Sequence, residues 1–377
     1  MINLERYVPQ ALGILHEDSG ISDYLKPQES EHQLSAGLTS ASAAMEHLLE
    51  DQSQKNIAHH LKRLEGFLRL RKLDRTLDLS AITAIQNDAN IEISGRIPRL
   101  YCAFHYGSYH QIVKFLVQSG VPVSILLTGN VIQSQVAEFR KSPEGQLCEF
   151  IDAENRLVIR RCQNAIEAGR SLVIYVDGNS GVGGEVLRED GSMIRINFLA
   201  GEIYVRTGIY QLARMLRRPI VTLISVFEDV NVRRIVVGRE QFIDRGSHCQ
   251  VVMQSLFTTL ASRVREDPAQ WEGWIYYTTY IRASREMQLR GNSELLKEFE
   301  QRQFRFNHQR FGLLRLEEGR FLLDKRTLAK LKLSKNCAEV LDQAIYGNEG
   351  LSIGNGTNSA QPYSRLIERL VGLEVLH

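Results

Sequence analysis

The chain has 377 residues, of which 46 are Lys or Arg and 44 are Asp or Glu, so its formal charge is +2. With 43% hydrophobic residues, this composition is typical of a globular protein and excludes a disordered or fibrous chain. The charge is spread along the sequence and no block is strongly basic, so nucleic acid is not expected as a partner. The length predicts two or three domains.

A transmembrane segment is not expected, because spanning a bilayer takes about 20 mostly apolar residues and the apolar runs here, such as 121–127 and 220–227, are short. The N-terminus has neither the basic start nor the long apolar stretch of a signal peptide. The cysteines are scattered without a CxxC pair, at positions 102, 148, 162, 249 and 337. This pattern is typical of a cytoplasmic protein with reduced thiols, and it argues against disulfides and structural zinc.

Residues 1–95 are predicted to be helical. Ile57, Leu61, Leu64 and Leu68 follow a 4-3-4 spacing that places them on one face of a helix. Polar residues at 51–53 are suited to capping its N-terminus. Nothing in this region suggests chemistry, so we interpret it as a helical cap or packing region.

Residues 96–282 alternate between buried-type strands and helices. Strands are predicted at 100–104, 121–127, 172–176, 220–226 and 234–237, and helices at 108–119, 157–168, 205–216 and 251–264. Continuous Val, Ile and Leu runs separated by helices indicate a sheet that is buried on both faces. The predicted fold class is therefore α/β, with a mixed, mostly parallel sheet covered by helices.

The remaining residues are predicted to form a connecting helix at 283–308 and a small C-terminal domain at 309–377. Short strands are expected at 311–316, 320–323 and 327–333, followed by helices at 334–346 and 362–371. Ser334 suits the N-cap of the first of these helices. The Gly- and Asn-rich stretch 347–358 between them is predicted to be a loop. Three strands followed by helices suit a small winged-helix domain.

His105 is the first candidate for chemistry, because it directly follows the apolar run 100–104. In open α/β sheets, reactive groups gather at the carboxyl ends of the strands. A histidine there can serve as a general base, since its pKa lies near the working pH. The alternative interpretation is a histidine whose polar atoms are simply satisfied in a turn.

Asp177 follows the apolar run 172–176 in the same way, and it can orient a histidine, bind a substrate or cap the next turn. The glycines at 178, 181, 183 and 184 fit neither the P-loop nor the dinucleotide fingerprint. The segment 178–181 (GNSG) is one residue shorter than the GxSxG elbow of hydrolases, so a serine triad is not expected. A metal site built from His105, His110 and Asp177 matches no common zinc motif, so no metal is expected. Cys102 is interpreted as a core residue rather than a nucleophile.

Several segments occur in an order that resembles a known family. They are the strand ending in His105, the strand ending in Asp177 and Gly178, then 196–201 (INFLAG), 212–214 (LAR) and 267–274 (DPAQWEGW). Over about residues 97–280 this order resembles the late acyltransferases of bacterial lipid A biosynthesis, a branch of the lysophospholipid acyltransferase superfamily.

The resemblance implies that His105 deprotonates an acceptor amine or hydroxyl, which then attacks an acyl thioester on an acyl carrier protein or coenzyme A. Such a reaction needs no metal or redox cofactor. It further implies a substrate site near Asp177. The residues expected to bind substrate there are Asn179, Phe198, Gly201, Arg206, Trp271 and Trp274.

The sequence departs from the family pattern at His110. Five residues after the catalytic histidine the family has an acid, which orients the histidine and stabilises its protonated form. A histidine cannot replace an anion, so three possibilities stay open: Asp177 or another carboxylate takes that place, the chemistry has changed, or the domain only binds. We keep His110 among the candidate catalytic residues. The N-terminal membrane anchor of these acyltransferases is also not found, which makes a lipid-embedded acceptor less expected.

The C-terminal segment 318–347 resembles the small winged-helix proteins related to the peptide chaperone of PQQ biosynthesis. Those domains recognise ribosomal precursor peptides, which add as a strand beside the third β-strand. The corresponding groove here lies between 327–333 and 363–371. Its expected peptide-binding residues are Leu328, Lys330, Lys332, Leu366 and Leu370. The alternatives are a winged helix that only packs against the enzyme and one that binds DNA.

Three hypotheses follow. In the first, the protein transfers a fatty acyl group from a thioester to a precursor peptide held by the C-terminal domain, in the biosynthesis of a lipidated ribosomal peptide. In the second, the acceptor is a lysophospholipid, a sugar or another small molecule, with a peripheral membrane contact. In the third, an inactive acyltransferase fold binds a carrier protein or peptide.

Overall fold

The computed structural model describes residues 4–16, 32–49, 54–140, 144, 147–178, 192–244 and 246–279. Towards the C-terminus it describes 303–304, 306–307, 310–316, 319–325, 327, 329–346, 351–352, 366, 370–371, 373 and 375–376. The chain divides into two compact units. The first comprises 1–18, 48–51 and 59–281, and the second comprises 19–47, 52–58 and 282–377.

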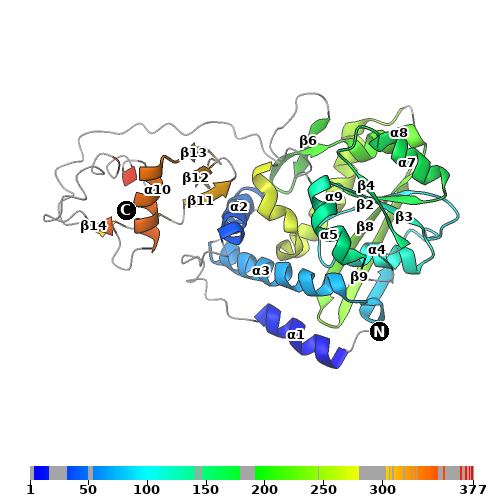
Figure 1. Ribbon diagram of the computed structural model, residues 1–377, viewed down its shortest axis with the longest axis horizontal. Coiled ribbons are helices and arrows are strands. Elements are labelled where there is room, and N and C mark those ends of the chain that lie inside the picture. The colour runs from blue at the N-terminus through cyan, green and yellow to red at the C-terminus, as the bar shows by residue number, and fades with distance from the viewer. Residues whose placement is uncertain are drawn as a thin grey trace. The chain divides into compact units, whose positions relative to one another are not determined.

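The first unit is built on a seven-stranded sheet (Figure 1). In sheet order its strands are β1 (Thr83–Gln86), β9 (Val232–Gln241), β8 (Ile220–Asp229), β2 (Leu100–Ala103), β5 (Ser171–Tyr175), β3 (Val123–Leu127) and β4 (Glu149–Asp152). All neighbouring strands are parallel except β8 and β9. The predicted α/β class with a mixed, mostly parallel sheet is confirmed.

Helices pack around this sheet, and a two-stranded hairpin extends the unit (Figure 1). The helices are α1 (Leu4–His16), α3 (Gln54–Thr76, which belongs to this unit from residue 59 onward), α4 (His110–Gln118), α5 (Gly129–Phe139), α7 (Val158–Glu167), α8 (Gly208–Leu216) and α9 (Cys249–Glu266). Short 3-10 helices cover Ser80–Ile82, Pro268–Gln270 and Glu272–Thr279, and the hairpin consists of β6 (Met193–Phe198) and β7 (Gly201–Arg206). Within the described residues, no helix combines the length and the apolar character needed to cross a membrane.

The structure corrects the sequence-based elements at several places. The strand β1 lies in the region predicted to be helical, and α5, β4, β6 and β7 were not predicted. The helix predicted over 205–216 begins only at Gly208, because its first two residues end β7. Both β1 and β4 are edge strands with only partial burial, so they lack the continuous apolar runs that identify the central strands.

The strands β2 and β5 lie side by side at the centre of the sheet, and the chain leaves them in opposite directions. From β2 it continues through α4 to β3, whereas from β5 it reaches β8 through α8 on the other side of β2. Right-handed crossovers place these two connections on opposite faces of the sheet. The carboxyl ends of β2 and β5 therefore flank a topological switch point, the usual position of a ligand site in such sheets.

The second unit contains a three-stranded antiparallel sheet in the order β11 (Phe311–Leu316), β12 (Gly319–Asp324) and β13 (Lys330–Lys332). The helix α10 (Lys335–Tyr346) follows, and the Oγ of Ser334 accepts a hydrogen bond from the Cys337 amide at 3.3 Å, as expected of an N-cap. A second small sheet pairs β10 (Gln303–Phe304) with β14 (Leu351–Ser352).

Two findings in this unit differ from the prediction. Gln303 and Phe304 form a strand, although they fall in the predicted connecting helix; most of that segment lies outside the described residues. The helix α2 (His32–Leu48) joins the unit through Lys325, whose Nζ lies 3.2 Å from the Ser42 Oγ and 3.5 Å from the Glu46 carboxylate. Nothing in the local sequence pattern indicates that this N-terminal helix belongs with the C-terminal strands.

Candidate active site

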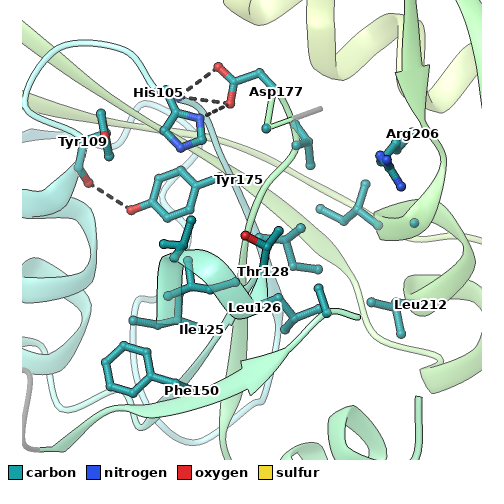
Figure 2. Close-up of a pocket in the computed structure, with 18 of the residues that line it drawn as sticks. His105, Tyr109, Ile125, Leu126, Thr128, Phe150, Tyr175, Asp177, Arg206 and Leu212 are labelled. Carbon is teal, nitrogen blue, oxygen red and sulfur yellow. Dashed lines mark hydrogen bonds and ion pairs between the residues drawn. The ribbon is translucent and has the colours of Figure 1, made fainter. Parts of the chain in front are cut away.

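The site is centred on His105 and Asp177, which follow the adjacent strands β2 and β5. In the parallel register Ala103 lies opposite Tyr175, so His105 and Asp177 each stand two residues beyond that pair. The His105 Nδ1 lies 2.8 Å from the Asp177 Oδ1 (Figure 2). The backbone amide of His105 donates to the same carboxylate, at 2.9 and 3.1 Å from its two oxygens. Asp177 therefore fixes both the ring and the main chain of His105.

Trp271 provides a third donor to this carboxylate. Its Nε1–H lies 2.9 Å from the Asp177 Oδ2, and both side chains are completely buried. The Trp271 ring packs between Phe198 and Trp274, with ring centroids 5.0 and 4.8 Å away. Gly273 is required beside it, because any Cβ at that position would overlap the indole. This aromatic cluster holds the indole N–H in place, and the indole in turn holds the carboxylate.

The His105 ring has one side towards Asp177 and the other towards a cavity, and its side chain is one-quarter exposed. Figure 2 shows its second ring nitrogen directed away from the carboxylate. The ring contacts Tyr109 and Tyr175, both with centroids 4.8 Å away. Burial disfavours the charged imidazole, but the charge and hydrogen bond of Asp177 outweigh this effect and raise the pKa of His105.

A buried ion pair supports the loop that carries His105. Arg71 on α3 lies 2.9 Å from the Glu272 carboxylate and donates to the carbonyl oxygens of Gly107, at 3.0 Å, and Gln270. The Glu272 amide donates to the carbonyl of His105 at 2.9 Å. Gly107 has a φ of +57°, and a Cβ there would collide with a carbonyl oxygen of β8, so only glycine fits this turn.

A second buried cluster holds the loop from the other side. The Asp74 carboxylate accepts hydrogen bonds from Ser108 and, at 2.7 Å, from the Tyr7 hydroxyl. Arg233 lies 3.3 Å from the same carboxylate, and neither charged side chain is more than 1% exposed. Because unpaired buried charges are costly, this cluster ties α1, α3, β9 and the loop into one rigid arrangement.

The cavity beside His105 has a volume of about 500 Å³, within the range of ligand pockets. Its wall is mainly apolar, as Figure 2 shows for Ile125, Leu126, Phe150 and Leu212. Val113, Val131, Val136, Val158, Ile159, Ile174 and Met215 add to this lining. Asp177, Tyr109 and Tyr175 are polar lining residues next to His105, and Thr128, Arg206 and Gln211 add polar groups to other parts of the wall. An elongated apolar group can therefore lie in the cavity with one end at the imidazole.

The structure places the predicted site residues in three groups. His105, His110, Asp177 and Arg206 line the cavity. Phe198, Trp271 and Trp274 are buried in the aromatic cluster behind Asp177 and do not line the cavity, and Gly201 begins β7 in the adjacent hairpin. Asn179 lies outside the described residues.

His110 does not take the place of the missing acid. It begins α4, and burial together with the charges of Arg75 and His105 holds its pKa well below the ordinary value, so it is neutral at pH 7. The carboxylate that bonds the His105 ring comes from Asp177, one of the alternatives that the sequence left open. Burial raises the pKa of Cys102 well above its ordinary value, which is opposite to what a nucleophilic thiol needs.

Sequence reasoning did not find Arg71, Asp74, Tyr109, Tyr175 and Glu272. Arg71 and Asp74 belong to a region in which no chemistry was expected, and nothing local marks them. Tyr109 falls inside the segment around His105, and Glu272 falls inside 267–274, so both were close to residues already singled out. Within the described residues, no group of three or more His, Cys, Asp or Glu side chains is arranged to hold a metal ion.

No protein-family model and no curated protein matches the chain. Among solved structures, it matches the 1-acyl-sn-glycerophosphate acyltransferase PlsC from Thermotoga maritima, with 8% sequence identity and a TM-score of 0.31. The match covers 67% of this chain and 97% of that one. At this distance the chemistry has to be inferred from the site itself.

The arrangement suits general base catalysis. When His105 Nδ1–H donates a hydrogen bond to the Asp177 carboxylate, the other ring nitrogen, Nε2, carries a lone pair that can accept a proton. The raised pKa makes this nitrogen a stronger base than a free imidazole.

Proposed function

We propose that the first unit is an acyltransferase in which His105 is the general base and the acyl chain of a thioester donor lies in the cavity. The observation that carries this proposal is the position of the His105–Asp177 pair in the wall of a mainly apolar cavity. Burying an acyl chain in this lining contributes about 0.8 kcal/mol for each methylene removed from water. The thioester carbonyl would then lie near the imidazole.

In this mechanism the acceptor amine or hydroxyl gives its proton to His105 Nε2 as its nitrogen or oxygen attacks the thioester carbonyl carbon. The new C–N or C–O bond forms, the C–S bond breaks, and the leaving thiolate takes the proton back from the imidazolium. Asp177 stabilises the imidazolium while it exists. The products are the acylated acceptor and a free thiol, on an acyl carrier protein or coenzyme A.

We further propose that the acceptor is a peptide bound by the second unit. The strand β13 pairs with β12, and a bound peptide would add as a strand along the opposite edge of β13. Lys330 and Lys332 alternate along this strand, and Lys332 is exposed, which suits an acidic peptide. Leu366 is partly buried and Leu370 is fully buried against α10, so Leu370 would support such a groove from within. Leu328 lies outside the described residues.

The other two hypotheses remain as alternatives. A lysophospholipid, a sugar or another small acceptor would use the same base and the same cavity without the second unit. An inactive binding protein would have no need of an imidazole held by a buried carboxylate, so the intact His105–Asp177 pair favours catalysis.

The test is thiol release from acyl carrier protein and coenzyme A thioesters, with the wild type beside His105→Ala, and mass spectrometry of added acceptor peptides. We expect release by the wild type and a loss of at least 100-fold in the variant, as is typical of a lost general base. Equal release by both proteins would remove His105 as the base.

For the peptide, Lys330→Glu/Lys332→Glu should abolish the mass gain, whereas Lys335→Glu, an exposed lysine at the start of α10, should leave it unchanged. Acyl transfer to small acceptors alone would favour the second hypothesis.

A further inference from the structure

The helices α7 and α8 contact each other, and both contribute residues to the cavity wall. Ile159 on α7 and Met215 on α8 both line the cavity, yet 47% and 53% of these residues are exposed. Leu157, just before α7, is 57% exposed. Two large apolar side chains of the cavity wall and a third beside them are therefore exposed to solvent, which suits an opening of the cavity at this place.

The same two helices carry a high density of exposed arginines. They are Arg156, Arg160 and Arg161 in and just before α7, and Arg214 and Arg217 in and just after α8. The helix α8 contains no acidic residue, and the acidic residue of α7 is Glu167 at its far end. Asp152 and Glu154 precede α7, so the five arginines of this surface face three carboxylates in the same segments, and the excess of positive charge attracts a negatively charged partner.

The chemistry of this surface favours a protein over a lipid bilayer. Neither helix contains a lysine, and their large exposed apolar residues are Ile159 and Met215, beside exposed arginines and the polar residues Gln163, Asn164 and Gln211. Arginine and methionine are enriched in protein interfaces, where lysine is depleted. The guanidinium group also pairs with carboxylates through two parallel hydrogen bonds.

We propose that the α7–α8 surface is the docking site for an acidic acyl carrier protein, which presents its acyl thioester to the cavity opening. This inference rests on the proposed function and specifies its donor as a protein-bound thioester. Carboxylates of the carrier pair with the exposed arginines, while the acyl chain passes between Ile159 and Met215 to His105.

The test compares the wild type with Arg160→Glu/Arg161→Glu, two exposed positions on α7 that do not line the cavity. A matched control is Arg239→Glu/Arg265→Glu, which reverses two exposed charges on β9 and α9. The donors are the same acyl group on acyl carrier protein, on coenzyme A and on uncharged pantetheine. Circular dichroism checks that all three proteins are folded.

We expect the α7 variant to raise the KM for the carrier-protein donor about tenfold or more, because reversed charges at an interface slow association and repel the partner. Its KM for acyl-pantetheine and the kinetics of the control should stay unchanged. An equal loss with coenzyme A and carrier protein would overturn the proposal, since the arginines would then bind phosphate rather than a protein surface. An unchanged KM for the carrier protein would also overturn it.

Binding measured without turnover separates this inference from the proposed function. Fluorescence anisotropy of labelled acyl carrier protein mixed with the His105→Ala variant reports docking alone. Adding Arg160→Glu/Arg161→Glu to this variant should raise the Kd for the carrier protein. If the carrier binds but no thioester is consumed by the wild type, docking stands and acyl transfer fails. The proposal is wrong if the carrier protein does not bind and phosphatidylglycerol vesicles do. If Arg160→Glu/Arg161→Glu abolishes the vesicle binding, the surface is a membrane contact.

Discussion

Replacing Asp177 with asparagine is the most direct test of the catalytic arrangement, because it removes the charge and preserves the shape. Three N–H groups converge on the carboxylate: the His105 amide and the Trp271 indole at Oδ2, and the His105 ring at Oδ1. The amide and indole can only donate, so the single oxygen of asparagine must occupy the Oδ2 position. The NH₂ group then faces His105 Nδ1, which has to accept, and the ring proton moves to Nε2.

This tautomer cannot act as a base, since the nitrogen directed towards the cavity already carries a proton. In serine proteases the same substitution leaves the geometry intact and lowers kcat about 10⁴-fold. We expect a loss of about 10³- to 10⁴-fold in kcat for Asp177→Asn, which corresponds to about 4–5.5 kcal/mol in the activation free energy. KM should change little, because the cavity wall is unaltered.

The assay is thioester turnover between pH 5 and 9. Wild-type kcat/KM should rise with pH and reach half its maximum above about 6.5, the ordinary value for histidine, because Asp177 raises the pKa of His105. In Asp177→Asn this raising interaction is lost while burial remains, so any residual rise should move to lower pH. Activity within threefold of the wild type, in a variant with unchanged thermal unfolding, would refute the proposed role of the carboxylate.

Three further predictions concern the surroundings of this pair. Trp271→Phe removes one hydrogen bond to the Asp177 carboxylate, worth about 1.5–3 kcal/mol, and should lower kcat about 10- to 150-fold. Trp274→Phe loses a hydrogen bond to a backbone carbonyl and should lower only the stability, so equal kinetics in the two variants would contradict this assignment. Arg233→Met leaves the Asp74 carboxylate buried without its ion-pair partner and should lower the free energy of unfolding in urea by about 3–5 kcal/mol. Adding Asp74→Asn should restore part of this loss, and a loss below about 1 kcal/mol in Arg233→Met would show that the fold does not need the ion pair. Gly107→Ala should strongly lower the melting temperature, because the new methyl group meets a backbone carbonyl at a positive φ; an unchanged melting temperature would mean that the turn can rearrange.

The central strands of the sheet could be predicted from the sequence. The apolar runs that became β2, β3, β5 and β8 are continuous because these strands are buried on both faces, and that pattern is local in the chain. The same pattern of apolar runs placed His105 and Asp177 directly after two of these strands. The general rule that active sites lie at carboxyl ends of strands was enough to select both residues.

The edge strands, and the helix α2 in the second unit, could not be predicted in this way. Partly exposed strands such as β1 and β4 carry a mixed pattern, so burial gives no periodic signal. The helix α2 contacts Lys325 through Ser42 and Glu46, which lie about 280 residues earlier in the chain. Contacts over such separations leave no trace in local periodicity.

Which carboxylate is hydrogen-bonded to the His105 ring follows only from the order of the strands in the folded protein. The family pattern directed attention to position 110, five residues away, but the order of the strands puts β5 beside β2 and brings Asp177 within 2.8 Å of the imidazole. Trp271 changed from an expected substrate contact to a donor that holds Asp177, because packing against Phe198 and Trp274 aims its N–H inward. Hydrophobic periodicity specifies each strand separately, whereas the order of strands follows from how all the helices and strands pack together, and this order determines which side chains meet.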